Sequence, residues 1–251
     1  MATPPSPPSS TTEPMLGILM LETQFPRIPG DIGNAATWPF PVRFRVVRGA
    51  SVEKVVLQDA RGLLPDFIAA ARELVAEGAA AITTSCGFLS LFQQDIAAAV
   101  SVPVALSALL QVPWVQATLP AGKRVGIITA SGATLTPAHL ATAGVPLDTP
   151  VIGIEDGREL FHVLVTAGKH DLDVALAEQD ILAAGRTLLA RHPDIGAIVL
   201  ECTNMPPYAA ALQAATGLPV YDICSLVTWL HAGLYPRRFA RPAPARDSTD
   251  A

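Results

Sequence analysis

The chain has 251 residues, of which 50% are apolar and 16% charged, and its formal net charge is −5. This composition excludes a wholly disordered chain and allows a sizeable core in one large domain or two small ones. A basic excess, normal in nucleic-acid binders, is absent, since 22 acidic residues face 17 basic ones. Three cysteines are too few for a disulfide scaffold, so we expect a cytoplasmic protein with free thiols.

Short apolar segments alternate with amphipathic ones between two tails rich in proline and polar residues, 1–14 and 236–251, which we expect to be disordered. Strands are predicted at 16–21, 42–47, 80–84, 102–105, 124–129, 151–154, 197–200 and 219–221. Helices are predicted at 62–76, 88–99, 108–118, 137–143, 159–166, 173–191, 207–215 and 225–234. This alternation indicates an α/β protein with parallel sheets.

The uncharged stretch 96–122 is long enough to span a bilayer. Prolines at 103, 113 and 120 interrupt it, so it is better interpreted as a helix end, a buried strand and a second helix. The proline-rich first 14 residues lack the apolar core of a signal peptide. We therefore expect no membrane association.

An internal similarity points to two related halves. Ala81–Cys86 matches Ala197–Cys202 at an offset of 116 residues, and Val102–Val104 matches Leu218–Val220 at the same offset. The hypothesis is that each half carries one cysteine at the carboxyl end of an equivalent strand.

Cys86 and Cys202 each lie in a turn between a strand and a helix, the position where open α/β sheets bind ligands. A helix N-terminus at each turn favours the thiolate form of the cysteine. Two thiols on opposite sides of a cleft suit a reaction that removes a proton from one face of a stereocentre and returns a proton to the other face. The alternative is that they are small buried hydrophobic residues, the interpretation we give to Cys224. No histidine lies near a cysteine in the sequence, so no metal site is expected.

The segments Thr83–Gly87 and Leu200–Pro206, with its Cys-Thr-x-x-Pro element, resemble the aspartate/glutamate/hydantoin racemase superfamily. The resemblance implies two pseudo-symmetric Rossmann-like lobes with the active site in the cleft between them, a catalytic pair Cys86 and Cys202, no cofactor, and a homo-oligomer. It implies a first lobe of 15–117 plus 218–235, with the last strand and helix rejoining it, and a second lobe of 118–217.

Two departures from the family pattern bear on the substrate. Gly87-Phe88 stand where amino-acid racemases carry a carboxylate-binding Asn-Thr, and Asn204 replaces a charged residue after Thr203. A less charged pocket makes aspartate and glutamate doubtful substrates and favours a hydantoin or another carbonyl-activated acid. The related arylmalonate decarboxylases keep only the second cysteine, so Cys86 argues against decarboxylation, whereas cis–trans isomerisation by thiol addition stays open.

Further substrate-binding candidates follow from position at the same sheet edges. Gln24 and Asn34 lie in the long loop after the first strand, where Asn34 is equally well explained as a turn cap. Ser131 occupies the corresponding turn of the second half, where capping is the simpler role. The remaining candidates flank the cysteines: Ser85, Gly87, Thr203 and Asn204.

The sequence thus predicts a cofactor-independent racemase or epimerase acting on a small amino acid, hydantoin or related acid. Ser85 and Thr203, with turn amides, would stabilise an enolate-like intermediate. Two alternatives remain: an isomerase or decarboxylase on the same scaffold, and a non-catalytic two-lobed protein that binds a small molecule.

Overall fold

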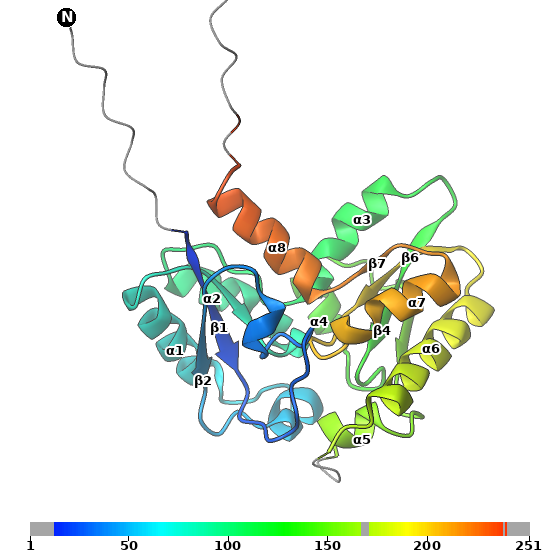
Figure 1. The fold of residues 1–251 in the computed structure, drawn as a ribbon, viewed down its shortest axis with the longest axis horizontal. Helices are drawn as coiled ribbons and strands as arrows, with labels where there is room; N and C mark the ends of the chain where they lie inside the picture. Colours follow the sequence, from blue (N-terminus) through cyan, green and yellow to red (C-terminus); the bar gives the residue numbers. More distant parts are fainter. Residues whose placement is uncertain (1–12, 167–170, 238, 240–251) are drawn as a thin grey trace, which may run out of the picture.

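A computed structural model describes residues 13–166, 171–237 and 239. The chain forms two parallel β-sheets, each flanked by helices and each at the centre of one lobe (Figure 1). This confirms the expected α/β class with two lobes. Most of the two proline-rich tails lies outside the described residues, so their predicted disorder is not addressed by the structure.

The first sheet has the strand order β2-β1-β3, from Val42–Val46, Met15–Met20 and Ala79–Thr84. The second has the order β5-β4-β6-β7, from Val151–Gly153, Arg124–Thr129, Ile195–Leu200 and Val220–Tyr221. The central strands β1, β3, β4 and β6 are almost wholly buried, which explains why they appear as continuous apolar runs in the sequence.

The two sheets repeat each other in register. Gly17 of β1 pairs with Ile82 of β3, and Gly126 of β4 pairs with Ile198 of β6. The predicted strand at 102–105 is reduced to a single bridge between Ile82 and Val104, and its counterpart is the pair formed by Ile198 and Val220. Ile82 and Ile198, like Val104 and Val220, are 116 residues apart, so the internal similarity reflects a repeated structural unit.

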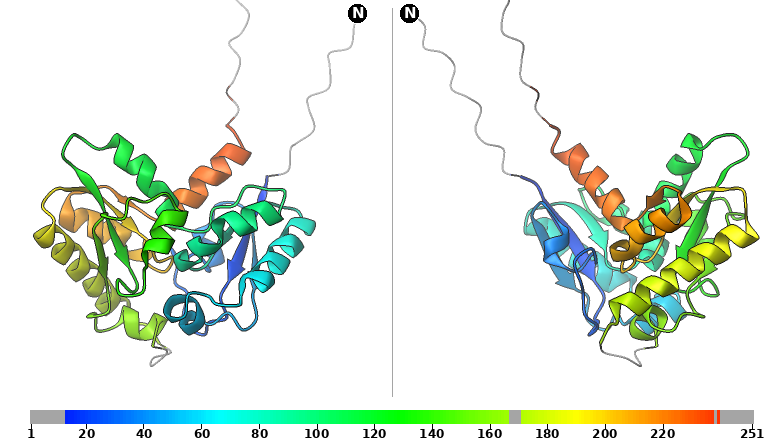
Figure 2. Two further views of the ribbon diagram at one scale, coloured as in Figure 1. Left: turned by 180° about the vertical axis from the view of Figure 1, so that it is seen from behind. Right: turned by 45° about the vertical axis from the view of Figure 1, so that its right-hand side comes forward.

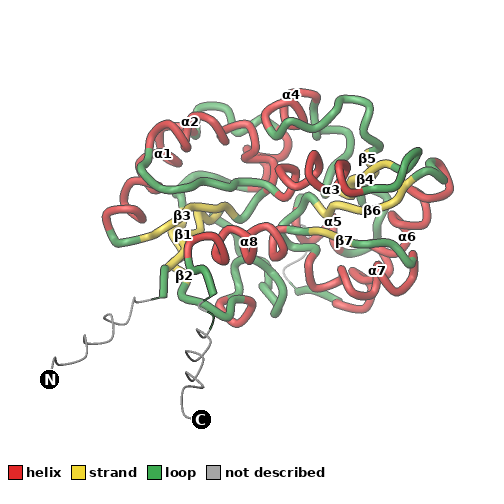
Figure 3. Tube along the Cα trace, turned by 90° about the horizontal axis from the view of Figure 1, so that it is seen from above, coloured by secondary structure: helices red, strands yellow, loops and turns green. Residues whose placement is uncertain are grey.

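One predicted boundary between the lobes is wrong. The last strand, β7, pairs in parallel with β6 and therefore completes the second sheet rather than rejoining the first lobe at 218. The chain crosses back only with the final helix, α8 (Ile223–Leu234), whose Leu226 and Val227 pack against Leu16 and Ile18 of β1. Hydrogen bonds to the free edge of β6 hold β7 in the second sheet. The apolar face of α8 covers the first sheet (Figure 3).

The remaining helices cover the sheets on both sides, as the two turned views show (Figure 2). They are α1 (Leu64–Ala76), α2 (Gln93–Ala99), α3 (Val112–Thr118), α4 (Pro137–Thr142), α5 (Leu160–Leu164), α6 (Val174–Arg191) and α7 (Ala209–Thr216). One continuous core runs through both lobes, joining Leu19 and Phe67 to Ile127 and Leu188. No described helix is long and apolar enough to cross a membrane.

Three predicted helices begin later than expected, because a short 3-10 segment precedes each of them. These segments are Gly87–Phe92 before α2, Ala108–Gln111 before α3 and Pro206–Tyr208 before α7. Two of the three follow the cysteine turns. The tight 3-10 geometry keeps the backbone close to the end of the strand and directs its first N–H groups toward the turn.

Candidate active site

The turns that follow β3 and β6 meet between the lobes. The Thr203 hydroxyl donates to the Ser85 carbonyl at 2.6 Å, and the Ile32 amide donates to the Thr203 carbonyl at 3.3 Å. The Ser85 hydroxyl in turn accepts from the Leu21 amide at 2.9 Å. These buried contacts fix the two turns against each other, and each turn carries one cysteine, as the repeat predicted.

Cys86 and Cys202 line the same small cavity. Its volume is about 20 Å³, enough for roughly one water molecule. The walls are mostly apolar. The lining residues beside the two cysteines are Leu21, Thr23, Phe25, Arg27, Val52, Val56, Ser85, Gly87, Phe88, Ala130, Leu164, Val165, Glu201 and Asn204.

A larger cavity of about 480 Å³ lies directly outside the small one. The two share Thr23, Phe25, Val52, Leu164 and Val165, so these side chains form the wall between them. Phe25 and Val52 come from the first lobe, and Leu164 and Val165 come from the second. The structure is therefore a closed form, in which separation of this wall would connect the thiols to the outside.

Both thiols are protonated at neutral pH in this closed form. Burial raises the pKa of Cys86 and of Cys202 well above the usual range, and the neighbouring Glu201 carboxylate raises both further. Backbone N–H groups of Phe88 and Asn204 act in the opposite direction, as the helix N-termini predicted. The expectation of a lowered thiol pKa is nevertheless wrong for this form, because desolvation outweighs those hydrogen bonds.

Glu201 is fully buried beside the two cysteines. Its Oε2 accepts a hydrogen bond from the Thr129 hydroxyl at 2.7 Å, whereas Oε1 has no hydrogen-bond partner within the described part of the chain. Burial raises the pKa of this carboxyl to about 7. The carboxyl lies against Gly87, where a Cβ atom would stand 2.2 Å from Oε1. Gly87 is therefore needed to make room for Glu201.

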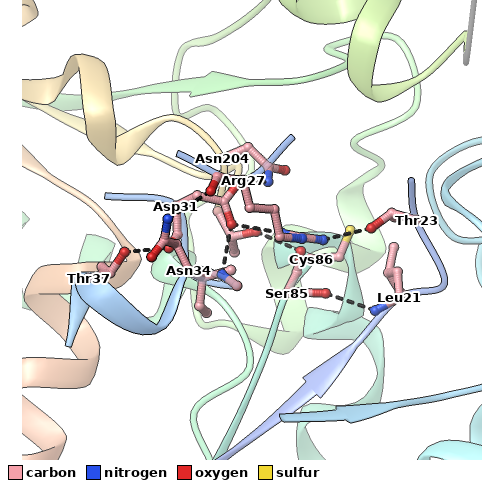
Figure 4. A network of polar contacts seen from close by, with 12 residues as sticks. Leu21, Thr23, Arg27, Asp31, Asn34, Thr37, Ser85, Cys86 and Asn204 are labelled. Atoms are coloured by element: carbon pink, nitrogen blue, oxygen red, sulfur yellow. Dashed lines mark hydrogen bonds and ion pairs between the residues drawn. The ribbon is translucent and has the colours of Figure 1, made fainter. Parts of the chain in front are cut away.

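Arg27 brings a positive charge to the lining of the cavity, and Figure 4 shows its polar contacts near Cys86. Its guanidinium pairs with Asp31 at 2.8 Å and donates to the Thr23 hydroxyl at 2.9 Å. Asp31 also accepts from the Asn204 side chain, and Asn204 Oδ1 accepts from the Cys202 thiol at 3.5 Å. A chain of polar contacts thus connects the first-lobe loop to the second cysteine.

The structure brings some predicted site residues together and separates others. Ser85, Gly87 and Asn204 line the cavity with the cysteines. Thr203 is buried beside it, with its hydroxyl engaged by Ser85.

Three predicted residues lie outside the inner cavity. Gln24 is exposed and borders only the outer cavity. Asn34 caps the 3-10 helix Ala35–Thr37 and donates to the Arg27 carbonyl at 2.8 Å, which matches its simpler interpretation as a cap. Ser131 is buried at the corresponding turn of the second lobe but is not part of the cavity lining.

Sequence reasoning missed Arg27, Asp31 and Glu201 as members of the site. A charged residue at the end of an otherwise apolar buried strand was the available signal for Glu201, since such residues are rarely buried without a specific reason. Arg27 and Asp31 are four residues apart in an irregular loop, a spacing that carries no distinctive signal there.

The fold resembles those of solved structures in the aspartate/glutamate/hydantoin racemase superfamily. A glycine-to-cysteine variant of arylmalonate decarboxylase superposes with a TM-score of 0.62 at 18% identity, covering 92% of this chain and 97% of that one. Allantoin racemase from Pseudomonas fluorescens gives 0.56 at 15% identity over 87% and 90%, and glutamate racemase from Bacillus anthracis gives 0.55 at 16% over 89% and 84%. These similarities confirm the superfamily fold.

Sequence comparison identifies a nearer group. A dimethylsulfoniopropionate lyase of Durusdinium sp. clade D is 30% identical over 226 residues, which cover 87% of this chain and 74% of that protein. Dimethylsulfoniopropionate lyase 6 of Emiliania huxleyi is 34% identical over 83% of this chain and 57% of its own length. No family model matches the sequence. The chain belongs to the family of these dimethylsulfoniopropionate lyases.

We expect Gly87→Ala to destabilise the protein by about 1–3 kcal/mol, because its Cβ would overlap the Glu201 carboxyl and stand 2.5 Å from the Glu201 carbonyl oxygen. Urea denaturation measures the change. The double variant with Glu201→Gly should recover part of the loss, since only the backbone contact remains. Equal stability of wild type and Gly87→Ala would contradict the close contact.

We expect the stability of the wild type to fall as the pH rises from about 5 to about 8. With its pKa raised from an ordinary 4.5 to about 7, Glu201 holds its proton more tightly in the folded state than in the unfolded chain. Unfolding therefore becomes easier across that interval. Glu201→Gln should remove this pH dependence. Its free energy of unfolding relative to wild type should therefore increase by up to about 3 kcal/mol as the pH rises from about 5 to about 8. Parallel pH profiles of the two proteins would refute the buried, proton-binding carboxyl.

Proposed function

We propose that this chain is a lyase that eliminates a cationic leaving group from a small carboxylate, with dimethylsulfoniopropionate or a close analogue as substrate. The observation that carries the proposal is the 30% identity to a dimethylsulfoniopropionate lyase across 87% of this chain. The cavity supports it, because two thiols, a guanidinium and a carboxyl surround a space with otherwise apolar walls.

The reaction requires one base next to the substrate's α-carbon. A thiolate removes the α-proton, the electron pair forms the double bond between the α- and β-carbons, and the β-carbon–sulfur bond breaks. Dimethyl sulfide leaves with the bonding pair, the product is acrylate, and the proton remains on the thiol until it passes to solvent. Cys86 and Cys202 are the two candidate bases, since both line the cavity.

Arg27 supports binding of the substrate carboxylate. Its guanidinium borders the cavity and is held in place by Asp31 and Thr23, which leaves a pre-oriented cation at the wall. Pairing with the carboxylate would also stabilise the negative charge that develops there when the α-proton is removed. The substrate reaches this position only when the wall between the inner and outer cavities opens.

We expect Cys86→Ser and Cys202→Ser each to lower kcat for dimethylsulfoniopropionate cleavage by roughly 100-fold or more, because both thiols contact the small space that the substrate must occupy. Dimethyl sulfide is measured by gas chromatography and acrylate by proton NMR. Cys224→Ser is the matched control, since Cys224 donates to the Gly30 carbonyl outside the cavity and should stay near wild type. Full activity of both cavity variants would exclude thiol chemistry.

Replacing Arg27 with Lys should raise KM about tenfold or more and lower kcat to a smaller extent, because the planar double donor is lost while a positive charge remains. Arg43→Lys, on the exposed strand β2, serves as the control and should leave both constants unchanged. A KM unaffected by Arg27→Lys would assign carboxylate binding to another group.

Racemisation of a small carbonyl-activated acid is the second candidate, favoured by the presence of two thiols in one cavity. Both reactions begin with removal of an α-proton. In D₂O, a racemase exchanges that proton and returns the substrate, whereas a lyase releases an unsaturated acid. Proton NMR of a panel of dimethylsulfoniopropionate, chiral amino acids and 5-substituted hydantoins therefore separates the two functions.

A further inference from the structure

The Glu201 carboxyl has no structural contact that accounts for its position. Thr129 satisfies one of its oxygens, and the other is buried without a hydrogen-bond partner among the described residues. Leaving such an oxygen unpaired is unfavourable, and leaving an ionised carboxylate unpaired is more so. Position 87 also has to be glycine, because a side chain there would overlap the Glu201 carboxyl. A buried carboxyl with an unpaired oxygen in a cavity wall indicates a ligand that would pair with that oxygen.

The charges around the cavity show what that ligand would carry. Arg27 and Glu201 line the cavity, and Arg27 is already paired with Asp31. With Glu201 ionised, these three groups sum to one negative charge. A ligand that places its carboxylate at Arg27 and a positive group at Glu201 would therefore be complementary at both ends.

The apolar walls suit a cation with alkyl substituents better than a hydrated ammonium. Phe88 contributes an aromatic ring to the lining, and Val52, Val56 and Leu164 contribute alkyl side chains. The ring of Phe25 is covered by the Arg27 guanidinium, 4.8 Å from its centroid. Aromatic faces attract alkylated cations, and the alkyl groups themselves gain from burial.

From this arrangement we propose that Glu201 is a specificity-determining residue, which selects substrates bearing an alkylated cation at the β-position over neutral ones of the same shape. The inference rests on the proposed function, which has the substrate's carboxylate bind at Arg27. It concerns binding, however, and can be tested without turnover.

Two ligands of equal shape, one cationic and one without the positive charge, isolate the contribution of that charge to binding. 3-(Trimethylammonio)propionate carries the cation, and 4,4-dimethylpentanoate replaces its nitrogen with carbon. Isothermal titration calorimetry gives Kd for each with wild type, Glu201→Gln and Glu201→Asp. Wild type should bind the cationic ligand on the order of tenfold more tightly than the neutral one. Glu201→Gln should reduce the ratio to about one, mainly by weakening the cationic ligand, and Glu201→Asp should retain part of it.

Glu73→Gln is the matched control, because it removes a carboxylate from the exposed face of α1 and should leave the ratio unchanged. A preference that survives in Glu201→Gln overturns the proposal. So does equal binding of the two ligands by wild type, or no binding of the cationic ligand at millimolar concentration. Absence of dimethyl sulfide production together with a preference that depends on Glu201 would refute the lyase function and leave this inference intact.

A second measurement needs no variant. The ratio of the two Kd values for wild type should fall from about pH 8 to about pH 5.5, as the Glu201 carboxyl takes up its proton. The ligands share their carboxylate, so a group that acts on the carboxylate alone changes both Kd values alike. The other titratable and charged groups on the surrounding elements are Cys86, Cys202, Arg27, Asp31 and His139. Both thiols stay protonated over this interval, because burial raises their pKa values. A ratio independent of pH would contradict the role of Glu201.

Discussion

The close approach of the turns after β3 and β6 is the contact on which the site depends. Strand register places Ser85 and Glu201 at equivalent ends of the two central sheets, since their amides donate to Leu19 and Ile128 at 2.8 Å in the same manner. The two copies of the repeated unit differ at this position. Ser85 is small and bonds to the backbone of its own lobe, whereas Glu201 reaches across to the opposite turn and fills the space above Gly87. A symmetric scaffold thereby acquires an asymmetric, charged cavity.

Desolvation dominates the electrostatics of that cavity. Helix N-termini near Cys86 and Cys202 favour thiolates, yet burial and the neighbouring Glu201 carboxyl raise the pKa of both thiols. The closed form therefore favours protonated thiols. Opening of the wall at Phe25 and Leu164, or arrival of a positive charge, would shift the balance toward the thiolate. Chemistry in such a site is tied to the presence of its ligand.

The sequence predicted the parts of the structure that depend on periodicity and repetition. The buried strands and the paired cysteine turns follow from apolar runs and from the offset of 116 residues. The lobe assignment of β7 failed because two residues of strand carry no information about which sheet edge is free. The contact of Glu201 with Thr129 was missed because the two residues are 72 positions apart in the sequence. The contacts of Arg27 were missed because they lie within a long irregular loop. Asn34, by contrast, caps a turn as its residue type allows.

A racemase and a lyase of this superfamily need not differ in their first step. Both remove a proton next to a carboxylate, and the fate of the resulting carbanion depends on the β-substituent. A sulfonium leaves readily and becomes neutral as it does so, which removes its attraction to Glu201 in the product. Stabilising the cation in the bound substrate thus lowers KM rather than raising kcat, because the interaction is lost as the sulfonium becomes neutral. The same cation, close to both thiols and the Glu201 carboxyl, would add positive charge beside the thiols. Substrate selection and thiol activation would then arise from a single electrostatic feature, the unpaired negative charge opposite Arg27.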